Sequence, residues 1–237
     1  MNPLPRPRAI TLDLDDTLWP VMPAILRAEA EVDAFLRARC PRTAEAFPPD
    51  AMRRLREQVA REYPHLDHDY TEQRRITLRR AIAHCGEDLA EVEPAFEVFY
   101  AARNRVEFYP DVPDALARIA ARVPVAGLTN GNADLARVGI AHHFRFNLGA
   151  REHGAAKPDP SIFLAACRRL GCAPGEVLHV GDDPMMDVTG ARRAGVRSCW
   201  INRGAHPWPH DPHRPELEFD SLAGLADWLD AAPDAPE

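Results

Sequence analysis

The sequence predicts an α/β protein with a doubly wound parallel sheet and an all-helical insert after the first strand. A short, β-branched apolar run at residues 8–13 has the composition of a buried strand. Apolar residues then recur at helical spacing from about residue 20 to residue 106, and beyond residue 110 short apolar runs alternate with helical stretches. Such alternation is typical of a Rossmann-like parallel sheet covered on both faces. We therefore expect a core domain at residues 1–19 and 107–237 and a helical domain at residues 20–106.

Four apolar stripes define the helical insert. The first starts after Pro23 and stops at Pro41, and the third is closed by Gly86, as expected because proline and glycine end helices. The stripes begin at Ile25, Met52, Leu78 and Leu89. This regular helical spacing predicts a domain without strands.

The second half of the chain supplies the other strands of the sheet. Short apolar runs predict strands near residues 123–128, 144–148, 177–180, 198–201 and 217–219. Helices are expected between them, near residues 112–121, 160–170 and 185–194, with others following Asn132 and residue 220. Each strand is followed by a connecting helix, so the strands are expected to run parallel.

The charge balance limits the classes of partner. The chain has 36 acidic and 29 basic residues and a net charge of −7, so it lacks the basic footprint that nucleic acid or an anionic membrane requires. A small anionic metabolite is still allowed, because it responds to the local field of a cleft. The expected partner is a small phosphorylated metabolite, and the sequence does not determine the oligomeric state.

The cysteines and the N-terminus favour a cytoplasmic protein. The five cysteines are odd in number and include no Cys-x-x-Cys pair, which favours reduced thiols over a disulfide framework. The first residues have no apolar stretch of the secretory type, and no apolar run is long enough for a membrane-spanning helix.

Polar side chains follow the predicted strands at the edge where ligands bind in open α/β sheets. These residues come from four segments and comprise Asp13, Asp15, Thr129, Asn130, Lys157, Asp182, Asp183 and Asp187. Lys157 is the only lysine in the sequence, so a site that needs a compact ammonium is indicated. We expect these carboxylates, the hydroxyl and the ammonium to share one site.

These residue types suit phosphoryl transfer. A carboxylate can accept the phosphoryl group covalently, and a cation must offset the repulsion between that carboxylate and the phosphate dianion. Mg²⁺ held by one or two carboxylates supplies such a cation. Asp13 and Asp15 are two residues apart, so in an extended segment both side chains point to the same side. One can therefore attack while the other protonates the leaving oxygen.

Four ordered segments resemble the motifs of the haloacid dehalogenase (HAD) superfamily: DLDDT at residues 13–17, the strand ending in Thr129, Lys157-Pro158, and GDDPMMD at residues 181–187. The helical insert lies where this family carries its C1 cap, which is expected to cover the site and select the substrate. The resemblance implies that Asp13 is the nucleophile and that Asp15 is the general acid and base.

The same resemblance implies the ligands of the phosphoryl group and the metal. Thr129, Asn130 and Lys157 are expected to bind the phosphoryl group. Asp182 is expected to bind Mg²⁺ together with Asp13 and the carbonyl oxygen of Asp15. Asp183 and Asp187 are further candidates for the metal shell, although Asp187 is equally well explained as an acidic residue in the first turn of a helix.

Asp15 indicates which branch of the superfamily the chain resembles. A departing halide needs no proton, and family dehalogenases lack this carboxylate, so its presence favours a phosphatase or a phosphomutase. The segments around residues 12–29, 128–135 and 176–203 resemble the YigB-type subgroup, which dephosphorylates flavin mononucleotide and the phosphorylated ribityl-aminouracil precursor of riboflavin. This implies 5-amino-6-(5-phospho-D-ribitylamino)uracil or flavin mononucleotide as substrate.

Other functions stay open at this stage. The substrate can instead be phosphoglycolate, a sugar phosphate or a nucleotide. A non-catalytic receiver-like phosphoacceptor domain also combines acidic residues, a hydroxyl and a lysine. Such domains are about half this length and lack a helical insert, so this alternative fits the sequence less well.

Overall fold

The computed structural model describes residues 4–209 and 214–233. The chain divides into two compact units. The α/β unit comprises Met1–Pro20, Phe108–Gly131 and Gly139–Glu237, and the helical unit comprises Val21–Glu107 and Asn132–Val138.

The α/β unit is built on a six-stranded sheet in which every neighbouring pair is parallel. The strand order is β3-β2-β1-β4-β5-β6, so the chain starts in the middle of the sheet and builds outward in both directions. The strands are β1 (Ala9–Leu12), β2 (Val125–Thr129), β3 (Asn147–Gly149), β4 (Val177–Gly181), β5 (Arg197–Ile201) and β6 (Leu217–Phe219). The predicted doubly wound sheet is confirmed.

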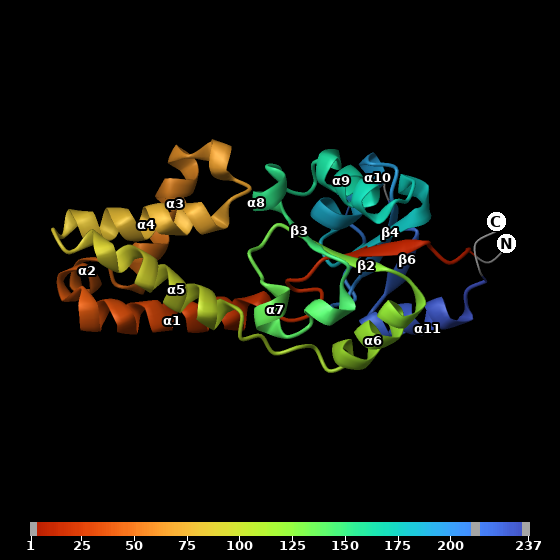
Figure 1. Cartoon of the computed structure of the whole chain (residues 1–237), viewed down its shortest axis with the longest axis horizontal. Helices are drawn as coiled ribbons and strands as arrows, with labels where there is room; N and C mark the ends of the chain where they lie inside the picture. Colours follow the sequence, from red (N-terminus) through yellow and green to blue (C-terminus); the bar gives the residue numbers. More distant parts are fainter. Residues whose placement is uncertain (1–3, 210–213, 234–237) are drawn as a thin grey trace. The chain divides into compact units, whose positions relative to one another are not determined.

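Helices cover both faces of the sheet (Figure 1). One face carries α6 (Val112–Arg122) and α11 (Leu222–Ala231), which pack against each other. The other carries α9 (Pro160–Leu170) and α10 (Gly190–Arg193), and a buried cluster that includes Ile162 and Phe163 fills the space beneath them. Shorter elements are α8 (Ala150–His153), η3 (Ala141–His143), η4 (Pro174–Glu176) and η5 (Pro184–Thr189). The single helix expected at residues 185–194 is therefore two pieces, the wide π-helical turn η5 followed by α10.

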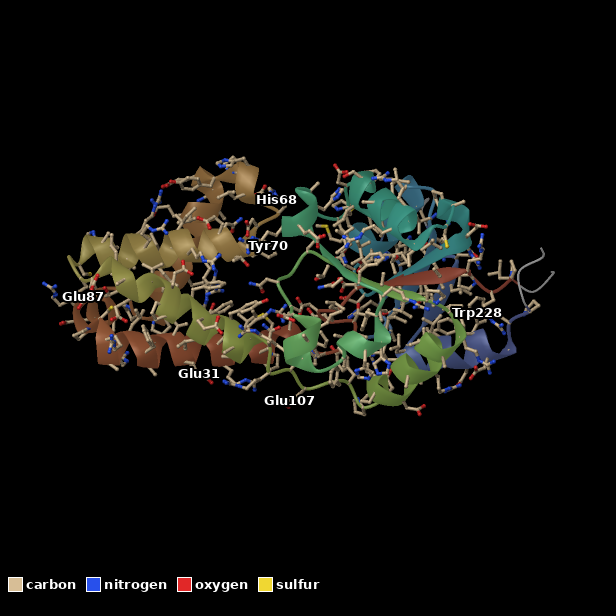
Figure 2. The ribbon with its side chains drawn as sticks, in the orientation of Figure 1. Glu31, His68, Tyr70, Glu87, Glu107 and Trp228 are labelled. Atoms are coloured by element: carbon tan, nitrogen blue, oxygen red, sulfur yellow. The ribbon has the colours of Figure 1, made fainter. Side chains whose placement is uncertain are left out.

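The helical unit contains no strand among its described residues. Its helices are α1 (Val21–Arg39), α2 (Pro41–Ala46), α3 (Pro49–Glu62), α4 (Tyr70–His84), α5 (Val92–Arg103) and α7 (Leu135–Val138), with short turns η1 (Pro64–Leu66) and η2 (Leu89–Glu91). The buried faces of α1, α4 and α5 form its apolar core, which includes Leu36, Ile82 and Phe99. Glu87, labelled in Figure 2, follows α4 and accepts hydrogen bonds from the backbone N (2.8 Å) and Oγ1 (2.6 Å) of Thr43 in α2.

The segment Asn132–Val138 belongs to the helical unit, whereas the sequence predicted it in the core domain. The reason is a set of polar contacts with α5 and its C-terminal end. Arg103 Nε donates to Asn132 Oδ1 at 2.9 Å, and the backbone N of Asp134 donates to Asn104 Oδ1 at 2.8 Å. Such contacts join residues about thirty positions apart, so local periodicity does not reveal them.

Two further observations concern the whole described chain. Across residues 4–209 and 214–233, none of the helices combines the length and apolarity needed to cross a membrane. All five cysteines are free thiols.

Candidate active site

The ammonium of Lys157 lies between two carboxylates at the carboxyl ends of the central strands. Its Nζ is 2.5 Å from Asp13 Oδ1 and 2.6 Å from Asp187 Oδ1. Lys157 is only 4% exposed, and both acidic residues are buried. The two negative charges raise the pKa of Lys157 despite its burial, so the ammonium keeps its proton.

Asn130, which follows β2, holds the backbone of Lys157. Its Nδ2 donates to the carbonyl oxygen of Lys157 at 2.9 Å, and its Oδ1 accepts from the backbone N of Lys157 at 2.8 Å. The resemblance implied that Asn130 binds phosphate. The structure shows that its side-chain amide positions Lys157, because both ends of the amide bond the backbone of that residue. The phosphate-binding role of Asn130 stays a prediction.

Thr129 ends β2 and is buried. Its Oγ1 accepts a hydrogen bond from the backbone N of Gly131 at 3.0 Å. The hydroxyl proton is therefore directed to another acceptor, as expected of a group that donates to a phosphoryl oxygen.

Asp13 and Asp182 are joined through a residue to which the sequence assigned no role. Thr17 Oγ1 lies 2.8 Å from Asp182 Oδ1 and 3.2 Å from Asp13 Oδ2. Carboxylate oxygens of Asp13, Asp182 and Asp187 lie within 4.8 Å of one another. Burial and the Asp187 and Asp15 charges raise the pKa of Asp13 to about 7, although Lys157 opposes the shift. Burial and the Asp13 and Asp187 charges raise the pKa of Asp182 to about 8.

This arrangement suits a divalent cation. A site with three carboxylates, two of them buried and that of Asp182 half-buried, and one ammonium carries more negative than positive charge, and the raised pKa values of Asp13 and Asp182 express that imbalance. Carboxylate oxygens are the ligands that Mg²⁺ prefers, and one or two of them are usually enough. Asp13 and Asp182 therefore fit the metal-binding role that the sequence assigned to them.

Asp187 is the partner of Lys157 in this site, and it also belongs to the acidic group that could hold a metal ion. Its Oδ1 accepts from Lys157 Nζ and from His179 Nε2 (3.0 Å), and its Oδ2 accepts from the backbone N of Asp183 (2.9 Å). Lys157 and His179 hold the pKa of Asp187 well below its usual range despite burial. With both oxygens engaged, Asp187 serves to anchor the ammonium.

Asp183 is an N-cap and is exposed. Its Oδ1 accepts from the backbone N of Met185 (2.7 Å) and of Met186 (2.8 Å) at the start of η5. Asp183 also lies outside the group of clustered acidic oxygens, so the structure adds no support for its predicted place in the metal shell.

A buried histidine supports Asp187 from within the sheet. His179 in β4 is fully buried, with Nδ1 2.9 Å from Thr11 Oγ1 and its ring edge-on to Phe163. Burial lowers the pKa of His179, so the ring is neutral near pH 7. The ionised Asp187 can only accept, which assigns the proton to Nε2 and makes Nδ1 the acceptor for the Thr11 hydroxyl.

The close approach of Asp187 to Gly181 explains why the segment GDDPMMD begins with glycine. A Cβ at this position would lie 2.2 Å from the carboxyl carbon of Asp187, which is far inside contact distance. The wide turn η5 returns Asp187 to the strand end, and only a residue without a side chain leaves room for it.

Asp15 lies beside this group and is half-buried. Trp19 Nε1 donates to its Oδ1 at 2.9 Å, which fixes the orientation of the carboxyl group.

The sequence did not identify Thr17, His179 or Gly181 as site residues. Thr17 belongs to the segment DLDDT and Gly181 to the segment GDDPMMD, but the sequence analysis assigned a role to neither residue. His179 was read as part of an apolar strand, and the only available signal was a polar residue within a run of buried positions.

Comparison with known proteins identifies the family. The family model of haloacid dehalogenase-like hydrolases matches residues 7–195. The chain belongs to the haloacid dehalogenase-like hydrolase family. It shares 36% identity over 231 residues with the 5-amino-6-(5-phospho-D-ribitylamino)uracil phosphatase YigB of Escherichia coli strain K12, covering 94% of this chain and 97% of that protein.

Other members of the HAD-like family also match along nearly the whole chain. The glyceraldehyde 3-phosphate phosphatase of Methanopyrus kandleri is 31% identical, with coverage of 93% of this chain and 96% of that protein. A crystal structure of a 2-haloacid dehalogenase from Pseudomonas syringae pv. Tomato DC3000 is 36% identical and superposes with a TM-score of 0.88, covering 94% of this chain and 98% of that one. This HAD-like hydrolase is therefore similar to proteins named phosphatase and to one named dehalogenase.

Proposed function

We propose that this HAD-like hydrolase is a Mg²⁺-dependent phosphatase that cleaves small phosphate monoesters through an aspartyl-phosphate on Asp13. The observation that carries the proposal is the position of Asp13, whose Oδ1 is held by Lys157 at 2.5 Å while Thr17 links its Oδ2 to Asp182. A buried carboxylate held in one orientation is prepared for attack on a phosphorus atom.

In this mechanism each residue of the site has its own catalytic role. Asp13 attacks phosphorus and the bond to the leaving oxygen breaks, while Asp15 gives that oxygen its proton. Asp15 next takes a proton from water, which hydrolyses the acyl phosphate and regenerates Asp13. Lys157 and Thr129 donate to the phosphoryl oxygens throughout.

Mg²⁺, when bound by Asp13 and Asp182, supplies the positive charge that offsets repulsion between the nucleophile and the phosphate. The resemblance adds the carbonyl oxygen of Asp15 as a ligand. Activity is expected to vanish with EDTA and to return with excess Mg²⁺, and a chelator-insensitive activity would contradict this part of the proposal.

A dehalogenase is the second candidate, because the chain is similar to the 2-haloacid dehalogenase described above. Asp15 favours the phosphatase, since a halide leaves without a proton and an alkoxide does not. Assays with 2-chloropropionate and with p-nitrophenyl phosphate decide between them. Chloride release without phosphate release would overturn the phosphatase proposal.

For the substrate we propose 5-amino-6-(5-phospho-D-ribitylamino)uracil or flavin mononucleotide. Support comes from the 36% identity with YigB over almost the full length of both chains. A panel containing both compounds, phosphoglycolate, glyceraldehyde 3-phosphate, a hexose phosphate and a nucleotide is expected to give the highest kcat/KM for one of the first two. If another compound ranks well above both, the substrate proposal fails and the phosphatase proposal survives. A requirement for an activating bisphosphate would instead identify a phosphomutase.

A further inference from the structure

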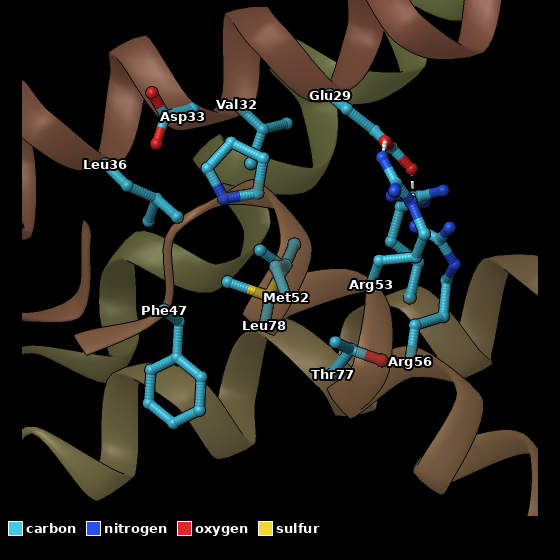
Figure 3. A pocket seen from close by; sticks show the side chains of 12 residues that line it. Glu29, Val32, Asp33, Leu36, Phe47, Met52, Arg53, Arg56, Thr77 and Leu78 are labelled. Atoms are coloured by element: carbon cyan, nitrogen blue, oxygen red, sulfur yellow. Dashed lines mark hydrogen bonds and ion pairs between the residues drawn. The ribbon is translucent and has the colours of Figure 1, made fainter. Parts of the chain in front are cut away.

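The helical unit contains a pocket of about 490 Å³, open to solvent, between α1, α3 and α4. Figure 3 shows that its lining is divided. One side, here called the apolar wall, consists of Val32, Leu36, Phe47, Met52 and Leu78. The other, here called the arginine wall, consists of Glu29, Arg53, Arg56 and Arg74. The pocket lies entirely within the helical unit, so it is distinct from the strand-end site of the α/β unit.

The arginine wall contains three arginines and one carboxylate, so its positive charges outnumber its negative charge by two. Glu29 is shared by Arg56 at 2.7 Å and Arg53 at 3.5 Å. Asp33 also lines the pocket, but it is paired with Arg37 at 2.8 Å. The acidic groups at the pocket are thus already used by other arginines.

Arg74 is the guanidinium without a carboxylate. Within the described part of the chain, no acidic side chain lies within ion-pair distance of it and no acceptor takes a hydrogen bond from it. Its Cζ stacks over the ring of Phe99 at 3.4 Å from the centroid, which orients the planar group and leaves its edge donors for a ligand. Burial and the charge of Arg56 lower the pKa of Arg74 to about 9, although Glu29 opposes the shift, as expected for a cation that lacks a partner.

We infer that this pocket binds a small organic anion whose acidic group pairs with Arg74 and whose apolar, ring-sized body lies against the apolar wall. The lining is of the kind found in sites for small organic molecules, which combine apolar side chains with a few polar groups. The structure specifies the chemistry of the ligand, an acidic group on an apolar body, and two kinds of molecule have that chemistry. The anion is either a free effector or a molecule that competes with the substrate.

The test uses two probes with the same body. The first is 8-anilinonaphthalene-1-sulfonate, and the second is N-phenyl-1-naphthylamine, which lacks the sulfonate. The full chain is titrated with each probe by fluorescence, and calorimetry gives the stoichiometry. One saturable sulfonate site per chain is expected, with an affinity at least about tenfold above that of the uncharged probe.

Three variants locate the site. Arg74→Gln is expected to weaken sulfonate binding about tenfold and to leave the uncharged probe unchanged. Arg79→Gln is the matched control, because Arg79 is exposed on the same helix and does not line the pocket, and it is expected to change neither probe. Met52→Ser is expected to weaken both probes, because it removes part of the apolar wall.

Sulfonate affinity that is unchanged in Arg74→Gln would overturn the inference, as would an equal preference for the two probes. If Arg74→Gln does not fold, Arg74→Lys keeps the charge and is expected to bind the sulfonate within about threefold of the parent chain. A loss much larger than that with the fold retained would also overturn it.

Phosphatase kinetics then identify the source. If the sulfonate raises KM without changing kcat, the natural anion competes with the substrate. If it binds the substrate-saturated enzyme equally well, the natural anion is a separate effector. Both outcomes support the pocket, and the binding assay itself needs no enzymatic activity, so failure of the proposed function and failure of this inference give different results.

Discussion

The strand-end site and the pocket of the helical unit carry opposite imbalances of charge. In the first, Lys157 is the only ammonium among three clustered carboxylates, and the pKa values of Asp13 and Asp182 are raised. In the second, Arg74 has no carboxylate partner and its pKa is lowered. A buried group whose charge the protein does not compensate marks the sign of the missing ligand. By this criterion we expect the first region to bind a cation with its phosphate and the second to bind an anion.

The largest expected effect tests the strand-end site. Asp13→Asn removes the nucleophile but keeps its shape, so kcat with Mg²⁺ is expected to fall at least about a thousandfold with the fold intact. Circular dichroism and a phosphate-release assay measure both quantities. Asp114→Asn, an exposed aspartate on α6, is the control and is expected to retain full activity. Activity of Asp13→Asn within tenfold of the parent would exclude Asp13 as the nucleophile.

A charge-conserving exchange at each region sharpens the comparison. Lys157→Arg is expected to lower kcat about a hundredfold, because a planar fork cannot occupy a point 2.5 Å from one carboxylate and 2.6 Å from another. Arg74→Lys in the open pocket is expected to change sulfonate binding by less than about threefold. Steady-state kinetics and probe titration measure the pair, and equal tolerance at both positions would break the comparison.

Substitution of His179 tests whether the strand-end site depends on the hydrogen bond that this buried residue donates to Asp187. His179→Phe keeps the ring packing and removes the donor to Asp187, so kcat is expected to fall about tenfold with little change in KM. His179→Gln retains a donor and is expected to recover most of that loss. His142→Phe, an exposed histidine, is the control. A lower melting temperature in His179→Phe with an unchanged kcat would reduce His179 to a packing residue.

The smallest expected effect is on stability. A carboxyl group with a raised pKa stabilises the fold fully below its unfolded pKa near 3.8, and this contribution is lost as pH rises through the folded values of about 7 and about 8. Without Mg²⁺, the melting temperature is therefore expected to fall from pH 6 to pH 9. Mg²⁺ replaces the protons, so the stabilisation it gives is expected to be roughly 5 °C larger at pH 9. Equal Mg²⁺ effects at both pH values in a thermal-shift assay would contradict the metal assignment.

The local sequence pattern was sufficient to predict the helices and strands and the polar residues near the ends of the strands. Asp13, Lys157 and Asp182 lie together because parallel strands bring their carboxyl ends to one edge, a rule that applies to any such sheet. The role of Asp187 was left open, because its distance from Lys157 depends on the wide turn η5, which no local signal predicts.

The remaining errors and omissions arise from contacts between distant parts of the chain. The segment Asn132–Val138 was assigned to the wrong unit because Arg103 and Asn104 hold it through side chains. The pocket was missed because α1, α3 and α4 line it together, and each helix alone shows only an ordinary amphipathic pattern. Apolar periodicity predicts that helices pack, but not where their packing leaves a space.

Lys157 also has a consequence for chemical labelling. Of the 29 basic residues it is the single lysine, so the chain offers reagents that acylate ε-amines only one target. In the folded protein that amine is buried, and its raised pKa keeps it protonated and unreactive. Acylation at this position therefore requires an opening of the structure. The rate of labelling of one residue thus reports how often the strand-end site is exposed, without any engineered tag or added fluorophore.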